Sequence, residues 1–214
     1  MSGTPGPPTG LYRLKPASQR LVGPLADRLA ARRVSPDLIT WLGVPVAAAG
    51  GACLALSPGV PTLLLAVPAL AALRLALNLL DGMVARRTAR AHAMGEMWNE
   101  LGDRLADLLF IGGLAWVPGV GPWLAFPAVI AALLASYVGI TSRAAGGSRQ
   151  YGGVMSKPGR MGVLAIAAPV ALVAGSDAPL AGAALIIGAG ALVTLVQRLV
   201  DARRQLHGPA ERRG

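Results

Sequence analysis

Apolar residues are concentrated in six long segments, and polar and charged residues collect in the stretches between them. Each segment has about 20 residues, which is the length that an α-helix needs to cross the hydrocarbon core of a bilayer. The pattern predicts an all-α, polytopic membrane protein with six transmembrane helices. We expect these helices at about residues 38–56, 62–81, 97–117, 122–142, 160–176 and 179–199.

Residues 11–34 precede the first predicted span and mix leucines at helical spacing with arginines on the other faces. This pattern is typical of an amphipathic helix that lies in the membrane interface. Residues 1–10 are rich in Gly, Pro and Thr without an apolar run, so they predict a disordered tail and no cleavable signal peptide. The six-helix domain is expected at 35–203, followed by a basic cytoplasmic tail at 204–214.

The composition favours a membrane protein over a nucleic-acid-binding protein. Of the 214 residues, 54% are hydrophobic, 14% are charged and 4% are aromatic, and the net charge is +10. A basic chain suits nucleic acid or an anionic membrane surface, but so few aromatic residues do not make a base-stacking platform. Cys53 is the only cysteine, which excludes an intramolecular disulfide and a cysteine-built zinc or iron–sulfur site.

Basic residues occupy alternate junctions between the predicted spans. The junctions at 57–61, 118–121 and 175–178 contain no Lys or Arg, whereas the others do. By the positive-inside rule we expect a plasma-membrane protein with both termini in the cytoplasm. Arg74 and Arg104 fall inside predicted spans, where a charge is costly, so each is expected to have an acidic or phosphate neighbour.

Small and polar residues follow helical spacing at the end of the second span and the start of the third. The first set is spaced i, i+3 and i+7, and the second set proceeds in steps of four. Each set therefore lies on one face of its helix, and two helices joined by a short link would present oxygen ligands to a shared cleft. Such donors suit Mg²⁺ or Mn²⁺. The two sets consist of Asn78, Asp81, Ala85, Gly95, Asn99, Asp103 and Asp107.

These residues resemble the signature of the CDP-alcohol phosphatidyltransferase family, Asp-x-x-Asp-Gly-x-x-Ala-Arg, eight residues, Gly-x-x-x-Asp-x-x-x-Asp. The chain matches every fixed position except the first and third aspartates, where it has Asn78 and Asn99. A fainter resemblance covers most of the chain and includes the interfacial helix, the six spans and residues 35–40, where members often carry Pro-Asn-x-x-Thr. The chain is identified as a variant member of this family.

The resemblance implies transfer of a phosphatidyl or related substituted phosphoryl group from a CDP-linked lipid to an alcohol, with release of CMP. The favoured donor is CDP-diacylglycerol, the expected cofactor is Mg²⁺ or Mn²⁺, and the expected assembly is a homodimer that serves phospholipid biosynthesis. The matching positions imply metal ligands at Asn78, Asp81, Asn99 and Asp103. Asp103 also corresponds to the general base for the acceptor hydroxyl.

The remaining signature positions are assigned to the donor. Gly82 and Ala85 have small side chains that let a nucleotide approach the helix backbone, and Arg86 can offer a bidentate guanidinium to phosphate. The expected donor-binding residues are Asp81, Gly82, Ala85, Arg86 and Gly95.

The two asparagines change the charge of the implied metal site. Each keeps a carbonyl oxygen but carries no charge, so the four ligand positions have two negative charges instead of four and should hold two divalent ions less tightly. Asp107 and Glu100 are candidates to restore charge on nearly the same helix face, and Asp107 ranks first.

A basic, glycine-rich stretch at 143–160 lies between the fourth and fifth spans. It could cradle an anionic substrate, and it matches the family's basic acceptor patch loosely. The candidate acceptor-binding residues are Arg149, Lys157 and Arg160. An equally weighted alternative is that these charges only fix the topology of the loop.

Two further function classes stay open. A non-catalytic CDP-lipid or nucleotide-binding protein that descends from such enzymes would explain Asn78 and Asn99. A small transporter would also carry intramembrane charges, but the chain has no convincing inverted repeat and its polar residues cluster at one membrane face. The acceptor alcohol could be glycerol phosphate, inositol phosphate, serine or a simpler alcohol.

Overall fold

The computed structural model describes residues 15–150 and 152–207, and every regular element in these ranges is helical. This confirms the predicted all-α class. The elements are α1 (Lys15–Ala31), α2 (Pro36–Leu56), η2 (Pro61–Leu65), α3 (Ala66–Arg87), α4 (Ala93–Gly112), η3 (Gly113–Trp116), α5 (Gly121–Ala144), α6 (Lys157–Ala174) and α7 (Ala178–Leu206).

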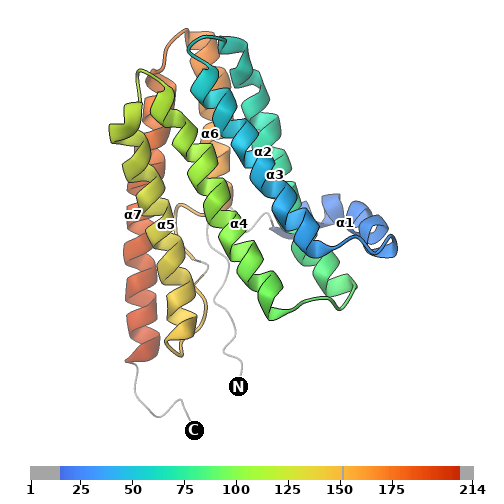
Figure 1. Cartoon of the computed structure of the whole chain (residues 1–214). Coiled ribbons are helices and arrows are strands. Elements are labelled where there is room, and N and C mark those ends of the chain that lie inside the picture. The colour runs from blue at the N-terminus through green and yellow to red at the C-terminus, as the bar shows by residue number, and fades with distance from the viewer. Residues whose placement is uncertain (1–14, 151, 208–214) are drawn as a thin grey trace.

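Helices α2 to α7 form an elongated bundle, and α1 lies across one of its ends (Figure 1). In the bundle α4 packs between α2 and α5, while α6 packs between α3 and α7. Proline stands in the first turn of α2, α5, α6 and α7. Its fixed φ suits a helix start, where the missing N–H has no partner to lose. These prolines explain why the helices begin within three residues of the predicted starts.

Five of the helical segments are long and apolar enough to cross a membrane: Pro36–Leu56, Pro61–Arg87, Gly121–Ala144, Lys157–Ala174 and Ala178–Leu206. Helix α4 covers most of the predicted third span and lies within the same bundle, but five of its residues are charged. It therefore falls short of a membrane span by composition. The chain is a multi-pass membrane protein, while the sixth span stays a prediction.

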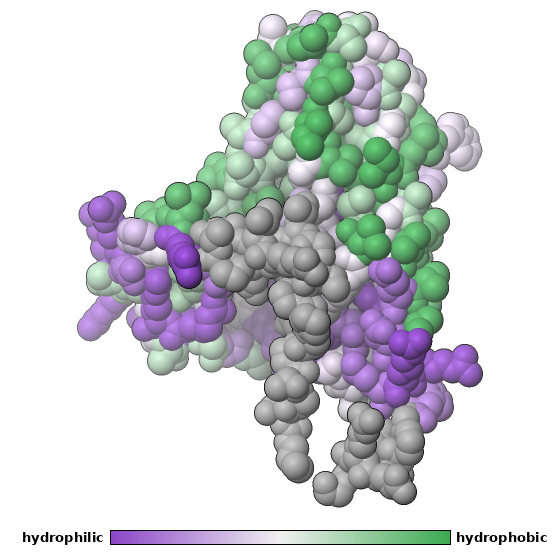
Figure 2. Space-filling view, turned by 180° about the vertical axis from the view of Figure 1, so that it is seen from behind, coloured by the Kyte–Doolittle hydropathy of each residue, from purple (hydrophilic) through white to green (hydrophobic). Residues whose placement is uncertain are grey.

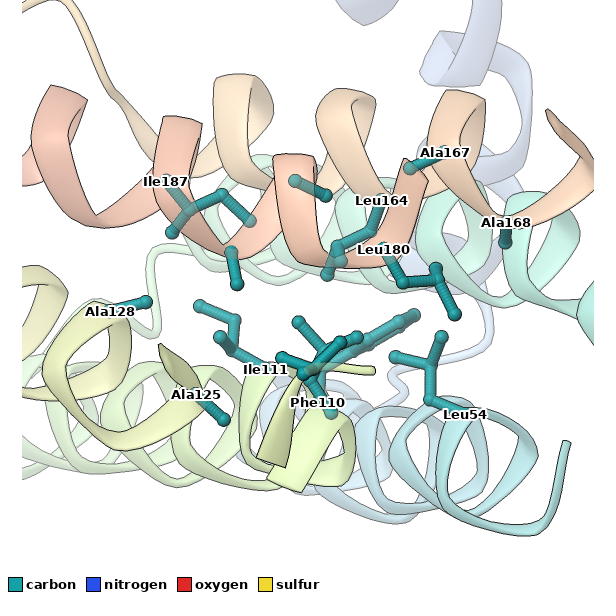
Figure 3. Packing of buried hydrophobic residues seen from close by; sticks show 14 of the residues in the cluster. Leu54, Phe110, Ile111, Ala125, Ala128, Leu164, Ala167, Ala168, Leu180 and Ile187 are labelled. Atoms are coloured by element: carbon teal, nitrogen blue, oxygen red, sulfur yellow. The ribbon is translucent and has the colours of Figure 1, made fainter. Parts of the chain in front are cut away.

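The apolar core fills the half of the bundle that is remote from α1. Leu54 of α2, Phe110 and Ile111 of α4, Leu164 of α6 and Leu180 of α7 point toward one another and are fully buried (Figure 3). Their convergence fixes how the helices pack at this end.

Glycines allow α2 to approach α4 and the adjoining η3 closely in this core. A Cβ on Gly113 would lie 2.6 Å from the Cα of Gly51, and a Cβ on Gly50 would lie 2.9 Å from Cδ2 of Phe110. Small residues at helix crossings let backbones touch, which is the main source of packing energy between helices in a membrane.

Helix α1 docks on α3 through both apolar and polar contacts. Ala26 is fully buried beside Leu80 and Val84. Arg87 of α3 forms an ion pair with Asp27 at 3.1 Å and donates to the carbonyl of Gly23 at 3.0 Å. An interfacial position for residues 11–34 stays a prediction, and residues 11–14 lie outside the described ranges.

Hydrophilic side chains gather at the end of the bundle where α1 lies, and hydrophobic ones dominate the opposite part (Figure 2). At this polar end α3 and α5 terminate and α4 and α6 begin. Helix α7 continues to Leu206 and so extends into the region predicted as the tail at 204–214. The predicted tail at 1–10 lies outside the described residues.

Candidate active site

A cavity of about 480 Å³ opens in the polar half of the bundle between α3, α4, α5, α6 and α7. Among the described residues that line it, four are carboxylates and six are cationic side chains. The lining therefore favours an anionic ligand. The carboxylates are Asp81, Glu100, Asp103 and Asp107, and the cations are Arg86, Arg104, Arg149, Lys157, Arg160 and Arg198.

Helices α3 and α4 bring the predicted ligand positions to one wall of this cavity. Asn78 and Asp81 of α3 line it together with Asn99, Asp103 and Asp107 of α4, and Asn78 contacts both Asn99 and Asp103. The helices are joined by a short link, and the side chain of the residue that precedes α4, His92, accepts a hydrogen bond from the N–H of Gly95 at 3.0 Å. The helical spacing of the two sets thus produces the shared cleft that the sequence predicts.

Asp81 is held by α2. Its side chain is 5% exposed, and its Oδ2 accepts a hydrogen bond from Thr40 Oγ1 at 2.8 Å. The N–H of Gly82 donates to its other oxygen, Oδ1. Sequence reasoning assigned no role to Thr40, although it stands at the Thr position of the stretch at 35–40 that resembles the family.

Asp103 is surrounded by donors. Its Oδ1 accepts hydrogen bonds from Arg74 Nη2 at 2.7 Å and from Asn78 Nδ2 at 3.1 Å, and its Oδ2 pairs with the ammonium of Lys157. Gly43 leaves room for Arg74, since a Cβ there would lie 3.0 Å from Arg74 Nη1. The acidic neighbour that the sequence requires for Arg74 is therefore Asp103.

The two asparagines contact each other. Asn78 Nδ2 donates to Asn99 Oδ1 at 3.2 Å as well as to Asp103. An amide can bridge two acceptors in this way because it supplies two N–H donors, whereas a carboxylate supplies none.

Asp107 does not face the cavity as a free ligand. Its Oδ2 accepts from Arg160 Nη2 at 2.6 Å, and Arg160 Nη1 donates to the carbonyl of Met155 at 3.2 Å. The side chains of Asp107 and Arg160 are 4% and 5% exposed. The pair is a buried tie between α4 and α6, which argues against the metal-ligand role expected for Asp107 and the acceptor role expected for Arg160.

A second group of ion pairs rims the cavity. Glu100 pairs with Arg104 on its own helix and with Arg149 from the α5–α6 loop. Glu96 pairs with Arg143 at 2.5 Å. Glu100 is therefore the acidic neighbour expected for Arg104, and Arg149 reaches the cavity as predicted.

The predicted donor-binding residues divide into two groups. Gly82 and Arg86 line the cavity, whereas Ala85 and Gly95 are outside the set of described residues that form its wall. Gly95 lies against the link between the helices, where an added Cβ would be 3.1 Å from His92 Nε2 and 3.2 Å from Asp37 Oδ1.

Arg198 is a cavity residue that sequence reasoning missed. Its Nη1 donates to the carbonyl of Ala135 at 2.6 Å, and its Nε donates to that of Gly152 at 2.9 Å. The sequence places Arg198 at the end of the last predicted span, just before the cations at 203 and 204, and nothing in its spacing distinguishes it from them.

Polar residues of α7 bind the loop that runs from Arg149 to Lys157. Thr194 Oγ1 accepts from the N–H of Met155 at 2.8 Å, and Gln197 accepts from the N–H of Val154 at 3.2 Å. Gly153 adopts a φ of +129° in this loop, a conformation that is open to glycine. The loop is thus fastened to the bundle on the side of the cavity.

Across the part of the chain that the structure describes, no three His, Cys, Asp or Glu side chains come together in a group that could hold a metal ion. Two of the four signature positions, Asn78 and Asn99, are amides and do not count toward such a group. The oxygen donors that remain near one another are Asp81, Asp103, Asn78 and Asn99.

Comparison with known proteins identifies the family. No family model matches the chain. A phosphatidylinositol phosphate synthase of Streptomyces avermitilis is 31% identical over 203 residues, which cover 87% of this chain and 79% of that protein. The chain belongs to the CDP-alcohol phosphatidyltransferase family. Inner membrane protein YnbA of Escherichia coli is 29% identical over 150 residues, 70% of this chain and 74% of that protein.

Solved structures support the fold of this family member. The phosphatidylinositol phosphate synthase of Mycobacterium tuberculosis with CDP-DAG bound matches with a TM-score of 0.71 at 23% identity, over 86% of this chain and 94% of that one. The same enzyme in complex with manganese and citrate gives a TM-score of 0.69 at 23% identity, over 84% of this chain and 87% of that one. The relatives at 30% identity or more confirm the family predicted from the signature and confirm that the protein is a transferase.

Proposed function

We propose that the protein transfers the phosphatidyl group of a CDP-linked lipid, with CDP-diacylglycerol as the favoured donor, to an alcohol and releases CMP. The observation that carries this proposal is the cavity wall formed by α3 and α4, where the signature residues face a ring of cations. A cleft that combines oxygen ligands with arginines suits a diphosphate. The crystal structure of the mycobacterial relative with CDP-DAG adds support.

The oxygen ligands at this wall fit a divalent cation, for which we propose Mg²⁺. Asp81 supplies a carboxylate, and Asn78 and Asn99 supply neutral oxygens at the same wall. Mg²⁺ is usually held by one or two carboxylates together with substrate phosphates. When bound, the ion would neutralise charge on the donor diphosphate. The manganese complex of the mycobacterial relative supports a divalent cation at this site.

The donor would enter beside α3. Gly82 offers a backbone without a side chain at the cavity wall, and Arg86 carries a guanidinium at the exposed end of the same helix. A guanidinium can bind two phosphate oxygens at once. We propose that Arg86 holds the diphosphate from the side of the membrane surface.

Asp103 stays our candidate general base. The acceptor oxygen attacks the phosphorus that carries the lipid, the bond from this phosphorus to the CMP oxygen breaks, and the acceptor proton passes to Asp103. A carboxylate oxygen has two acceptor positions, so Oδ2 can pair with Lys157 and still accept the hydroxyl. Lys157 would at the same time place a positive charge where the diphosphate gains negative charge.

We propose an acceptor alcohol that itself carries an anionic group. Arg149 and Arg198 line the cavity on the side of the α5–α6 loop and could bind it. We leave Arg160 out of this subsite because Asp107 and the Met155 carbonyl already bind two of its guanidinium nitrogens.

We also propose the membrane orientation that the sequence predicts. Both termini and the open polar end would face the cytoplasm, since the junctions at that end carry the basic residues. The homodimer rests on the family resemblance alone.

A second candidate function is a non-catalytic CDP-lipid or nucleotide-binding protein. The observation in its favour is that Asn78 and Asn99 remove two charges from the wall and Arg74 and Lys157 engage Asp103. This alternative expects donor binding without CMP release.

The test measures CMP release from CDP-diacylglycerol by purified protein with Mg²⁺ and a panel of charged and neutral alcohols. Asp81→Asn and Asp103→Asn should each lower turnover by at least about a hundredfold, because each removes charge opposite the reacting phosphate. Asp177→Asn is the matched control, since Asp177 accepts from the N–H of Gly119 in a loop pair outside the cavity. Donor binding without turnover in the unaltered protein would contradict the enzyme and support the binding protein.

A further inference from the structure

The carboxylates of the cavity differ in how much of their charge is already neutralised. Asp103 meets Arg74 and Asn78 at one oxygen and Lys157 at the other, and Asp107 is paired with Arg160. Glu100 is paired with two arginines. A metal ion at any of these groups would have to displace a bound cation or lie directly beside one.

Asp81 is the exception among the described carboxylates that line the cavity. Its partners are the hydroxyl of Thr40 and the N–H of Gly82, which are neutral, and it forms no ion pair with a described residue. Its negative charge is therefore available to a divalent ion, and the amide oxygens of α3 and α4 lie at the same wall.

Asn78 and Lys157 bind the two oxygens of one carboxylate, that of Asp103. The amide of Asn78 donates to Asp103 Oδ1, while the Lys157 ammonium pairs with Oδ2. A carboxylate at position 78 would face Asp103 as a like charge instead of donating to it. The neutral amide at position 78 lowers the number of negative charges at this wall, and the lysine places a positive charge beside Asp103.

We infer that the cavity holds a single divalent ion, at Asp81, and that the ammonium of Lys157 fills the cation position beside Asp103. This inference rests on the proposed function for its chemistry, because both charges would face the donor diphosphate. Lys157 is anchored in the first turn of α6 and its side chain is 12% exposed. A cation fixed by the chain cannot dissociate, so one of the two positive charges at the site does not depend on metal concentration.

The first experiment counts bound ions by electron paramagnetic resonance during a titration of the detergent-solubilised protein with Mn²⁺ alone. The unaltered chain should bind about one Mn²⁺, as expected for a site with one available carboxylate. Asp81→Asn should abolish this binding. Binding of two ions, or of none at saturating Mn²⁺, would overturn the inference.

The next variants test separately how Asn99 and Lys157 affect the number of bound ions. Asn99→Asp alone should leave the count at about one, because Lys157 still blocks Asp103, whereas Lys157→Met combined with Asn99→Asp should raise it to about two. Lys157→Gln with Asn99→Asp repeats this comparison with a polar side chain, in case the methionine variant does not fold. A count that stays at one in a folded double variant would contradict the role of Lys157.

Arg149→Met is the control for general loss of positive charge. Arg149 also lines the cavity, but its ion pairs are with Glu100 and Glu96 instead of Asp103. The Mn²⁺ count should remain at about one in this variant. Since the titration uses no donor lipid, a failure of CMP release would reject the proposed function without changing the ion count, and two ions in an active enzyme would reject the inference alone.

Discussion

The two ends of α4 are built on different principles. Near Phe110, and at Gly113 where η3 continues the chain, it fits against glycines of α2 with no space for another carbon atom. Near Glu100 and Asp103 the same helix borders a cavity of about 480 Å³ and is held by ion pairs from three other elements. Close packing fixes the position of one end of α4, and ion pairs fix the position of the other. The helix can therefore hold polar groups in place while the cavity beside them stays open.

The Asp107–Arg160 pair lies between these two ends, and its disruption should have the largest effect on stability. Arg160→Met leaves the carboxylate of Asp107 buried without a cation, which should cost about 3–5 kcal/mol. The unfolding free energy in detergent measures this loss. Arg160→Met combined with Asp107→Leu should recover most of it, and a single variant as stable as the unaltered chain would place the pair in contact with water.

A smaller effect is expected at the packed end. Gly113→Ala should destabilise the protein by about 1–3 kcal/mol, because the new methyl group meets the backbone of Gly51. Gly112→Ala is the matched control at the preceding residue, the last of α4, since no atom of a neighbouring element lies within 4 Å of a Cβ at that position. Comparable melting temperatures for both variants would mean that α2 and α4 can separate without cost.

The smallest effect is expected at the rim. Arg143 and Glu96 form a pair at 2.5 Å, but their side chains are 60% and 47% exposed. Water screens such a pair, so a double-mutant cycle with Arg143→Gln and Glu96→Gln should give a coupling below about 0.5 kcal/mol. A coupling as large as that of Asp107 with Arg160 would erase the distinction between buried and exposed charges at the polar end.

The sequence predicts the helices well because apolar length and proline position are local properties. It also predicts that Asn78, Asp81, Asn99 and Asp103 share a cleft, since helical spacing and a short link determine that arrangement. The third apolar segment is the instructive case: its charged residues were assigned to chemistry, and the same residues remove α4 from the set of helices apolar enough to span a membrane.

Pairings across the bundle are beyond the reach of the sequence pattern. Arg160 was expected to bind the acceptor and Asp107 a metal, yet they bind each other across 53 positions of the chain. Arg198 and Thr40 enter the site in the same way, from helices whose rotation about their own axes depends on packing. The close approach of Gly51 to Gly113 is likewise a property of two helices together.

The order in which the ion pairs are completed has a consequence for biosynthesis. Helix α4 leaves the ribosome with Asp103 and Asp107 well before Lys157 and Arg160 of α6 have been synthesised. During that interval Arg74 is the cation already available to Asp103, while Asp107 has no partner, and an unpaired carboxylate is costly in lipid. Asp107 therefore gains its cation only when α6 packs against α4, and we expect the packing of α4 to be completed only after α6 has been synthesised.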